Sequence, residues 1–301
     1  MRSRLVCALV YWLGVVATLT GCGSAPAPSG LSAGIVSDDL GNGLRTYRQE
    51  DLTPVGILVW FHGMDSDGTE FDHDPRQRHF AEPFLRTGWV IASATAGGNS
   101  FGKDAALRDY RNLIGVAQTR YRTGHLVFAA ESMGAIAALR LMAEPAYRNV
   151  RSMVGISPLT GIPPTLRGVD FIADAWDGLV PARADPLSVY PKRFAGKRFR
   201  FFYSPADTVV PTGADARAFA IRFGKVADVE LVQCRGDHAD PPATRVMMRS
   251  PSSGGRRANP LHRLSRPPFL LAEPPRSAHR ATLSCWPSRP VLPTEPPFSA
   301  G

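Results

Sequence analysis

The stretch of sequence that decides the fold is Ala130-Glu131-Ser132-Met133-Gly134. It ends an apolar run of buried-strand length, Leu126 to Ala130, and begins a run rich in small residues, Met133 to Ala143, with helical spacing. A serine in a sharp strand-to-helix turn needs small neighbours two positions away on each side, because strand and helix approach closely there. Ala130 and Gly134 meet this need, although glycine is the commoner first residue. The sequence therefore predicts a strand, a sharp turn at Ser132 and a helix.

The same alternation continues on both sides of this turn. Between residues 44 and 240, short apolar runs alternate with longer amphipathic ones, as expected for βα units. The predicted strands are Val55 to Phe61, Trp89 to Ala94, Leu126 to Ala130, Ser152 to Ile156, Phe199 to Tyr203 and Val229 to Val232. The predicted helices are Asp104 to Tyr121, Met133 to Ala143 and Thr212 to about Phe223, before Gly224. We therefore predict an α/β domain over residues 44–240, with helices on both faces of a mostly parallel sheet.

Two residues further along the chain are candidates to activate Ser132. A serine is a weak nucleophile until a base takes its proton, and a carboxylate must orient that base. Asp207 lies just beyond the strand Phe199 to Tyr203, and His238 follows the last strand. Taken singly, a turn-forming aspartate and a surface histidine are competitive alternatives. The chain order and the strand positions together favour a Ser132-Asp207-His238 triad at one edge of the sheet.

Acyl-transfer chemistry on Ser132 also needs hydrogen-bond donors for an oxyanion. We expect the backbone N–H of Met133 to be one donor. The second would come from the loop after the first predicted strand, from the N–H of Met64 or Gly63. His62 in the same loop is interpreted as a buried, hydrogen-bonded residue without a catalytic role.

Acidic and histidine side chains crowd the segment that follows this loop and raise the question of a metal site. They are Asp65, Asp67, Glu70, Asp72, His73, Asp74 and His79. An EF-hand loop has glycine at its sixth position and glutamate at its twelfth, whereas this segment has Gly68 fourth and Arg76 twelfth. We interpret the segment as a solvated acidic loop and expect neither a metal nor another cofactor.

These motifs together resemble the α/β-hydrolases of the esterase type, and in particular exported actinobacterial members, over about residues 50–240. The resemblance is carried by Phe61-His62-Gly63, by Ala96-Gly97-Gly98-Asn99-Ser100-Phe101-Gly102 with Asp104 and Tyr110, by Glu131-Ser132-Met133-Gly134, by Asp207-Thr208-Val209-Val210-Pro211 and by Gly236-Asp237-His238. It implies an α/β-hydrolase fold in which Ser132, Asp207 and His238 are nucleophile, acid and base. The short segment between Ile156 and Phe199 implies a short cap over an open cleft, with Asn99 and Trp176 as candidates to line the substrate side.

The N-terminal residues predict an exported and lipid-anchored protein. Arg2 and Arg4 precede an apolar run from Leu5 to Leu19 that is rather short for a membrane-spanning helix, a pattern typical of a signal peptide. Leu19-Thr20-Gly21-Cys22 resembles the bacterial lipobox, so residues 1–22 would be a lipoprotein signal peptide with Cys22 as the lipidated residue. An ordinary cysteine beside a simple cleavage site is the alternative. Residues 23–43 would form a linker and N-terminal segment.

The C-terminal residues differ sharply from the rest of the chain. Residues 241–301 hold 13 of the 27 prolines, nine arginines, two glutamates and no lysine or aspartate, so they carry most of the net charge of +9. This composition predicts a disordered tail, and it is also typical of a frameshifted reading of GC-rich DNA, which is our interpretation. Because the remaining chain is nearly neutral, we do not expect a nucleic-acid partner.

The function that these features predict is hydrolysis of a carboxylic ester at the cell envelope. The substrate would be a small-molecule or lipid ester, and the membrane would be reached through the lipid on Cys22. Two alternatives stay open. Acyl transfer would use the same triad and acyl-enzyme, and a non-catalytic envelope lipoprotein would keep the fold as a binding module.

Overall fold

The computed structural model describes residues 32–238. The predicted signal peptide with Cys22, most of the predicted linker and the predicted tail 241–301 lie outside the described residues. Among residues 32–238, no helix has the length and apolar character needed to cross a membrane.

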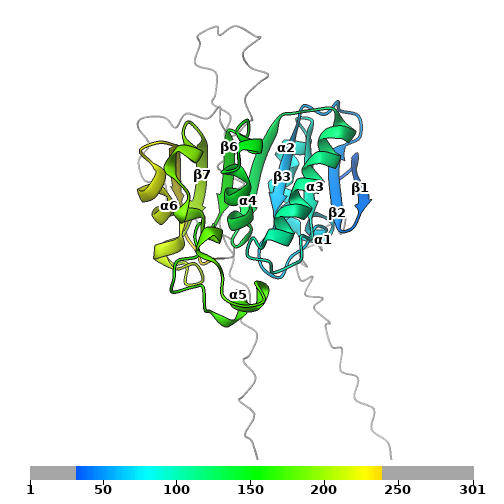
Figure 1. Ribbon diagram of the computed structural model, residues 1–301. Coiled ribbons are helices and arrows are strands. Elements are labelled where there is room, and N and C mark those ends of the chain that lie inside the picture. The colour runs from blue at the N-terminus through cyan, green and yellow to red at the C-terminus, as the bar shows by residue number, and fades with distance from the viewer. Residues whose placement is uncertain (1–31, 239–301) are drawn as a thin grey trace, which may run out of the picture.

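One eight-stranded sheet forms the centre of the structure (Figure 1). Its strand order is β1-β2-β4-β3-β5-β6-β7-β8. The pairs β1–β2 and β2–β4 are antiparallel, and all other neighbouring strands are parallel. The strands are β1 (Ile35–Gly41), β2 (Leu44–Gln49), β3 (Gly56–Phe61), β4 (Trp89–Ala94), β5 (Leu126–Glu131), β6 (Ser152–Ile156), β7 (Arg198–Tyr203) and β8 (Asp228–Gln233).

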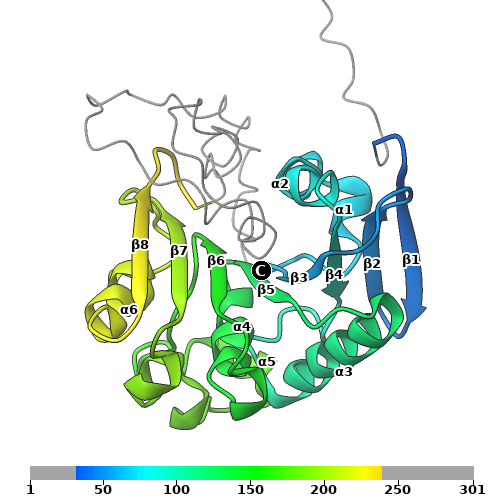
Figure 2. The same cartoon turned by 90° about the horizontal axis from the view of Figure 1, so that it is seen from above.

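Helices cover both faces of the sheet (Figure 2). One face carries α3, α4 and α6, and the other carries α1 and α2 beside β3 and β4. The helices are α1 (Glu70–His73), α2 (Pro75–Leu85), α3 (Asp104–Tyr121), α4 (Gly134–Met142), α5 (Asp170–Ala175) and α6 (Ala216–Phe223). The predicted fold class, a mostly parallel sheet with helices on both faces, is confirmed.

The central parallel strands and α3 form where their sequence patterns predict them. Every residue of β3, β4 and β6 is buried, as expected for parallel strands covered on both faces. The apolar side of α3 buries Leu107, Tyr110, Leu113, Ile114 and Ala117 against the sheet, while its charged side faces outward. The bounds of β4, β6 and α3 equal the predicted ones.

Three segments differ from the sequence-based expectation. The strand β1 lies within the stretch 23–43, so the sheet begins before residue 44. The last helix begins at Ala216 and not at Thr212, because the Asp215 side chain accepts hydrogen bonds from the N–H groups of Arg217 and Ala218 and so caps it. The acidic segment is a loop only as far as Thr69, since Glu70–His73 forms α1 and Pro75 begins α2, and Glu70 is only 3% exposed.

Both outer strands of the sheet carry acidic residues in ion pairs. On β1, Asp38 pairs with Arg120 on α3, at 3.1 Å, and Asp39 pairs with Arg45 of β2, at 3.2 Å. On β8, Glu230 pairs with Arg200 of β7, at 2.7 Å. The outer strands therefore present charge, whereas β3, β4 and β6 near the middle of the sheet are buried along their whole length.

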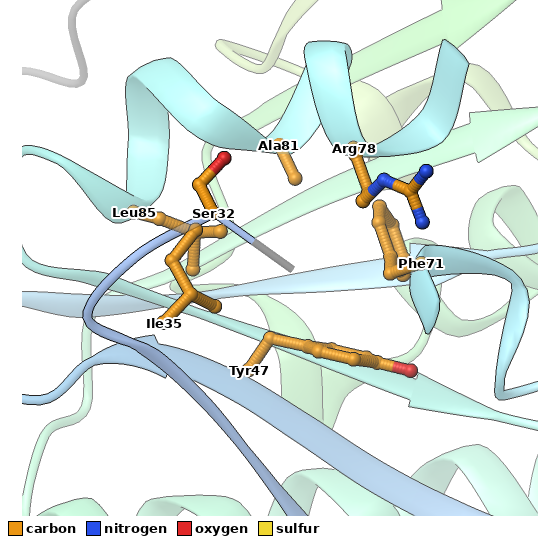
Figure 3. Close-up of a pocket in the computed structure, with 7 residues that line it drawn as sticks. All are labelled: Ser32, Ile35, Tyr47, Phe71, Arg78, Ala81 and Leu85. Carbon is orange, nitrogen blue, oxygen red and sulfur yellow. The ribbon is translucent and has the colours of Figure 1, made fainter. Parts of the chain in front are cut away.

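A small cavity lies between the β1–β2 hairpin and α2 (Figure 3). Its lining is mainly apolar and includes Ile35, Tyr47, Phe71 and Leu85. The Tyr47 hydroxyl, at the edge of this group, donates to the carbonyl of Gly68 at 3.3 Å. The cavity belongs to the packing of α2 on the sheet, and none of the predicted site residues lines it.

A cap connects β6 to β7 at the carboxyl edge of the sheet. It contains α5 and three short 3-10 turns: Ala182–Ala184, Pro186–Ser188 and Pro191–Phe194. Its buried residues Ile162, Ile172 and Val180 cluster with Phe101 and Met133 from the body of the domain. This cluster fixes the cap beside Ser132, a residue that is only 8% exposed.

Candidate active site

Ser132 lies in the strained turn that the sequence predicts between β5 and α4. Its φ is +49°, a left-handed conformation that a residue with a side chain adopts rarely and at a cost in energy. Its N–H donates to the carbonyl of Ile156, and its carbonyl accepts from the N–H of Leu159, each at 3.0 Å. A Cβ atom at Gly134 would collide with the backbone carbonyl of Phe61. Glycine at that position lets α4 pass close enough to β3 to hold the turn.

The structure brings the three residues of the predicted triad together. Nε2 of His238 lies 2.8 Å from Oγ of Ser132, and Nδ1 lies 2.8 Å from Oδ2 of Asp207. With Nδ1 facing a carboxylate, the imidazole carries its proton on Nδ1 and presents an acceptor to the serine hydroxyl. This arrangement can take a proton from Ser132 and stabilise the imidazolium that forms.

Asp207 is positioned by the backbone that follows it. Its Oδ1 accepts hydrogen bonds from the N–H groups of Val209 at 2.9 Å and Val210 at 3.0 Å, which leaves Oδ2 directed to His238. The side chain of Asp207 is 8% exposed. Two backbone donors and one imidazole therefore compensate the carboxylate for the loss of water.

A buried serine connects the loops that carry Asp207 and His238. Ser204, which follows β7, donates a short hydrogen bond to the carbonyl of Gly236 and accepts one from the N–H of Ala206. Gly236 has a φ of +109°, a conformation that suits glycine. Ser204 thus holds the Gly236-Asp237-His238 turn against the turn that presents Asp207.

The predicted oxyanion residues lie at the ends of β3 and β5. Met133 follows Ser132 directly, at the N-terminus of α4, and its side chain is buried in the cap cluster. Gly63 and Met64 follow β3, beyond a buried His62. The ring nitrogens of His62 lie 2.7 Å from the carbonyl oxygen of Gly63 and 2.9 Å from that of Thr95. His62 is therefore packed and hydrogen-bonded, in agreement with the interpretation from the sequence.

The two residues predicted to line the substrate side make contacts within the protein. The Asn99 side chain exchanges two hydrogen bonds with Asp65. Nε1 of Trp176 donates to the carbonyl of Phe101 at 3.3 Å, and the guanidinium of Arg140 lies over its ring at 5.6 Å from the centroid. Both residues join loops at the carboxyl edge of the sheet, and their contact with substrate stays a prediction.

Two glutamates, the buried Glu70 and the half-buried Glu131, received no role in the prediction from the sequence. Glu70 accepts hydrogen bonds from Nε1 of Trp60 and from Oγ of Ser66, and burial raises the pKa of its carboxyl to about 8. Glu131 accepts one from Nε2 of Gln77 at 2.6 Å, and burial also raises its pKa. The Glu131 carboxyl packs against Gly63. The sequence signals for this pair were a glutamate directly before the turn serine and Glu70 in the acidic segment.

No family model matches this sequence, and no curated protein matches it either. Solved structures, in contrast, match over about two thirds of the chain. The fluorophosphonate-binding serine hydrolase F of Staphylococcus aureus has a TM-score of 0.52 at 15% identity, and the match covers 68% of this chain and 91% of that one. An esterase of Rhizomucor miehei has a TM-score of 0.54 at 14% identity, with 70% and 80% covered.

A thermostable esterase of Pseudomonas putida gives a third match, with a TM-score of 0.52 at 15% identity over 68% of this chain and 75% of that one. This chain has the α/β-hydrolase fold. In the α/β-hydrolase fold the nucleophile lies at a strand-to-helix turn, and the triad follows the chain order serine, acid, histidine. Ser132, Asp207 and His238 occupy these places at the carboxyl edge of the sheet.

Proposed function

We propose that this protein is a serine hydrolase that cleaves carboxylic esters, with Ser132 as nucleophile, His238 as base and Asp207 as the orienting acid. The observation that supports the proposal most directly is the unbroken chain of two 2.8 Å hydrogen bonds from Ser132 through His238 to Asp207. It occurs on a fold whose similar structures include two named as esterases and one named as a serine hydrolase.

The proposed reaction has two halves that share one base. Oγ of Ser132 attacks the ester carbonyl carbon while its proton passes to Nε2 of His238. The tetrahedral intermediate collapses, His238 returns the proton to the leaving alkoxide, and an alcohol departs from an acyl-enzyme. A water molecule then attacks the acyl carbon, gives its proton to His238 and releases the carboxylic acid and free Ser132.

The backbone N–H of Met133 and that of Gly63 or Met64 would donate to the oxyanion. The first is at the N-terminus of α4, where helical N–H groups lack partners within the helix. Such donors contribute roughly 2.7 to 4 kcal/mol each to transition-state stabilisation in comparable sites. The role of Asp207 is to keep the proton on Nδ1 and to offset the positive charge on His238.

A panel of p-nitrophenyl esters of increasing acyl length tests the proposal, with fluorophosphonate labelling as a second readout. The wild-type protein should turn over at least one ester and label at Ser132. Ser132→Ala should lose both, by roughly 10⁴-fold or more in kcat, with thermal unfolding nearly unchanged. Turnover retained in Ser132→Ala would contradict the assignment of the nucleophile.

The proposal extends to location. We propose that the protein is exported and held at the cell envelope by acylation of Cys22, on the basis of the lipobox that precedes it. Cys22→Ser should release the protein from the membrane fraction or block its processing. Normal maturation with an unchanged distribution would contradict the anchor.

A further inference from the structure

Two loops at the carboxyl edge of the sheet are joined by a reciprocal pair of hydrogen bonds. The N–H of Asp65 donates to Oδ1 of Asn99 at 2.7 Å, and Nδ2 of Asn99 donates to Oδ1 of Asp65 at 2.8 Å. Asp65 follows β3 and Asn99 follows β4, and these strands are parallel neighbours in the sheet. Both residues are exposed, so water competes for each bond and only a well-fitted pair forms both.

The pair fixes a residue whose backbone is in an unfavourable conformation. Asp65 has a φ of +59°, in the left-handed region that non-glycine residues occupy infrequently. Such a conformation persists when the surrounding structure specifies it by several contacts. The hydrogen bond from the N–H of Asp65 and the one to its side chain are two such contacts, and both come from Asn99. The conformation of Asp65 in turn sets the direction of the chain through Met64.

The loop that presents Asn99 is itself firmly held. Nε2 of His62 lies 2.9 Å from the carbonyl oxygen of Thr95, and the N–H of Gly98 donates to the same carbonyl at 2.8 Å. Phe101 is buried with the cap residues, and its carbonyl accepts from Trp176. The loop 95–102 is therefore anchored on both sides of Asn99.

The segment Gly63-Met64 lies between two points of attachment to this loop. His62 attaches it on one side through Thr95, and Asp65 attaches it on the other through Asn99. These two residues carry the backbone N–H groups that we assign to the oxyanion. Because the attachment points are only three residues apart, a change at either one moves the intervening N–H groups directly.

We propose that Asn99 and Asp65 form a brace that orients the backbone N–H of Gly63 or Met64 toward the oxyanion, so that Asn99 is a positioning residue. This inference rests on the proposed function, since it assumes that an oxyanion forms at Ser132. The brace differs from the substrate-lining role that the sequence predicts for Asn99, because the side-chain oxygen and nitrogen are each engaged by Asp65.

The expected consequence is a specific kinetic signature. Charge develops on the oxyanion in the transition state and not in the bound ester, so donors aimed at it affect kcat more than KM. Loosening the brace should therefore lower kcat with KM nearly constant. A residue that contacts substrate would instead change KM.

A charge-swap series tests the brace. Asn99→Asp places two carboxylates together and breaks the bond from Nδ2, so kcat on the best p-nitrophenyl ester should fall tenfold or more while KM changes less than twofold. Asp65→Asn alone keeps an oxygen acceptor for Asn99 and is the reference for the double variant. The double variant Asn99→Asp with Asp65→Asn exchanges the side-chain donor and acceptor, restores the bond between the two side chains and should recover most of kcat. Asn112→Asp, the same change on the exposed side of α3, should leave kcat unchanged.

Three outcomes overturn the brace. They are an unchanged kcat in Asn99→Asp, a loss of kcat that Asp65→Asn does not restore, and a change in KM at constant kcat, which would indicate substrate contact. If Asn99→Asp unfolds, Asn99→Ala removes both bonds without adding charge and carries the same expectation of a lower kcat. Failure of the proposed function is distinguishable, because the wild-type protein would then show no ester turnover that depends on Ser132, whatever the Asn99 variants do.

Discussion

Two carboxyl groups near the edge of the sheet, Asp207 after β7 and Glu70 after β3, are both largely shielded from water and have different partners. Asp207 accepts two backbone N–H bonds and faces an imidazole at 2.8 Å. Glu70 accepts one bond from Trp60 and one from Ser66, and its pKa is raised to about 8 because desolvation outweighs them. The two carboxyl groups thus differ in the number and kind of their partners: those of Asp207 hold it toward His238, and those of Glu70 join it to Trp60 and Ser66.

The largest expected effect is on activity, and it distinguishes the region of Asp207 from the region of Glu70. Asp207→Asn removes the charge that keeps the proton on Nδ1 of His238 and stabilises the imidazolium, so kcat for ester hydrolysis should fall about 10³- to 10⁴-fold. Glu70→Gln should keep most of the activity. Steady-state kinetics of the two variants on one ester make the comparison.

The matched control is Asp174→Asn, a change at an exposed carboxyl in α5, which should be nearly neutral. Asp237 is the other acidic residue close in sequence to His238. If Asp237→Asn were the inactive variant and Asp207→Asn were active, the acid would be wrongly assigned.

The second expected effect is on the pH dependence of stability, which should depend on Glu70. The folded-state pKa of Glu70 is about 8 and the unfolded value is near 4.5, so the folded protein binds the extra proton between these pH values. The contribution of Glu70 to the free energy of unfolding should therefore be fully present below about pH 4.5. It should be lost as the pH rises from 4.5 through 8. The change from this one group is on the order of 5 kcal/mol.

Glu70→Gln keeps an oxygen acceptor for Trp60, offers Ser66 an amide N–H in place of the carboxylate oxygen that accepts from it, and removes the titration. Its denaturant-unfolding free energy should change less between pH 5 and pH 9 than that of the wild type, and it should be the more stable protein at pH 9. Glu50→Gln, at an exposed glutamate, is the control. A wild-type pH dependence that persists in Glu70→Gln would show that other groups cause it.

The smallest effect contrasts the serines that support the two regions. Ser204→Ala removes the bond that holds the His238 turn, and we expect kcat to fall about tenfold, short of the roughly 10²-fold cost of a 1 Å displacement. Ser66→Ala removes a bond to Glu70 and should lower the unfolding free energy by about 1 kcal/mol with little loss of kcat. Equal losses of kcat in both variants would contradict the distinction between the two regions.

The sequence predicted the inner elements well because their patterns have local causes. The runs that became β4 and β6 are buried on both faces, and α3 repeats apolar residues at helical spacing, so composition and period define them. The hairpin β1–β2 was missed because its strands are rich in polar and charged residues at the edge of the sheet. Its Asn42-Gly43 turn was a signal that could have revealed it.

The candidate site likewise has residues that the sequence predicted and residues that it did not. Ser132, Asp207 and His238 were brought together by chain order and strand ends, which the sequence contains. The burial of Glu70 depends on Trp60 from β3, and the pairing of Asn99 with Asp65 depends on which loops are neighbours. Such contacts between distant segments depend on the order of the strands in the sheet. Residue patterns alone did not predict that order.

The ion pairs on the outer strands have a consequence for association between molecules. An edge strand offers unpaired backbone groups on which a strand of another chain can add, and charged side chains are a common protection against this. A strand that approached β1 or β8 would have to strip water from Asp38, Asp39 or Glu230 and disturb their arginine partners. Neutralising these acidic residues should therefore raise the tendency of the protein to form β-rich aggregates on storage, with no direct change to the arrangement around Ser132.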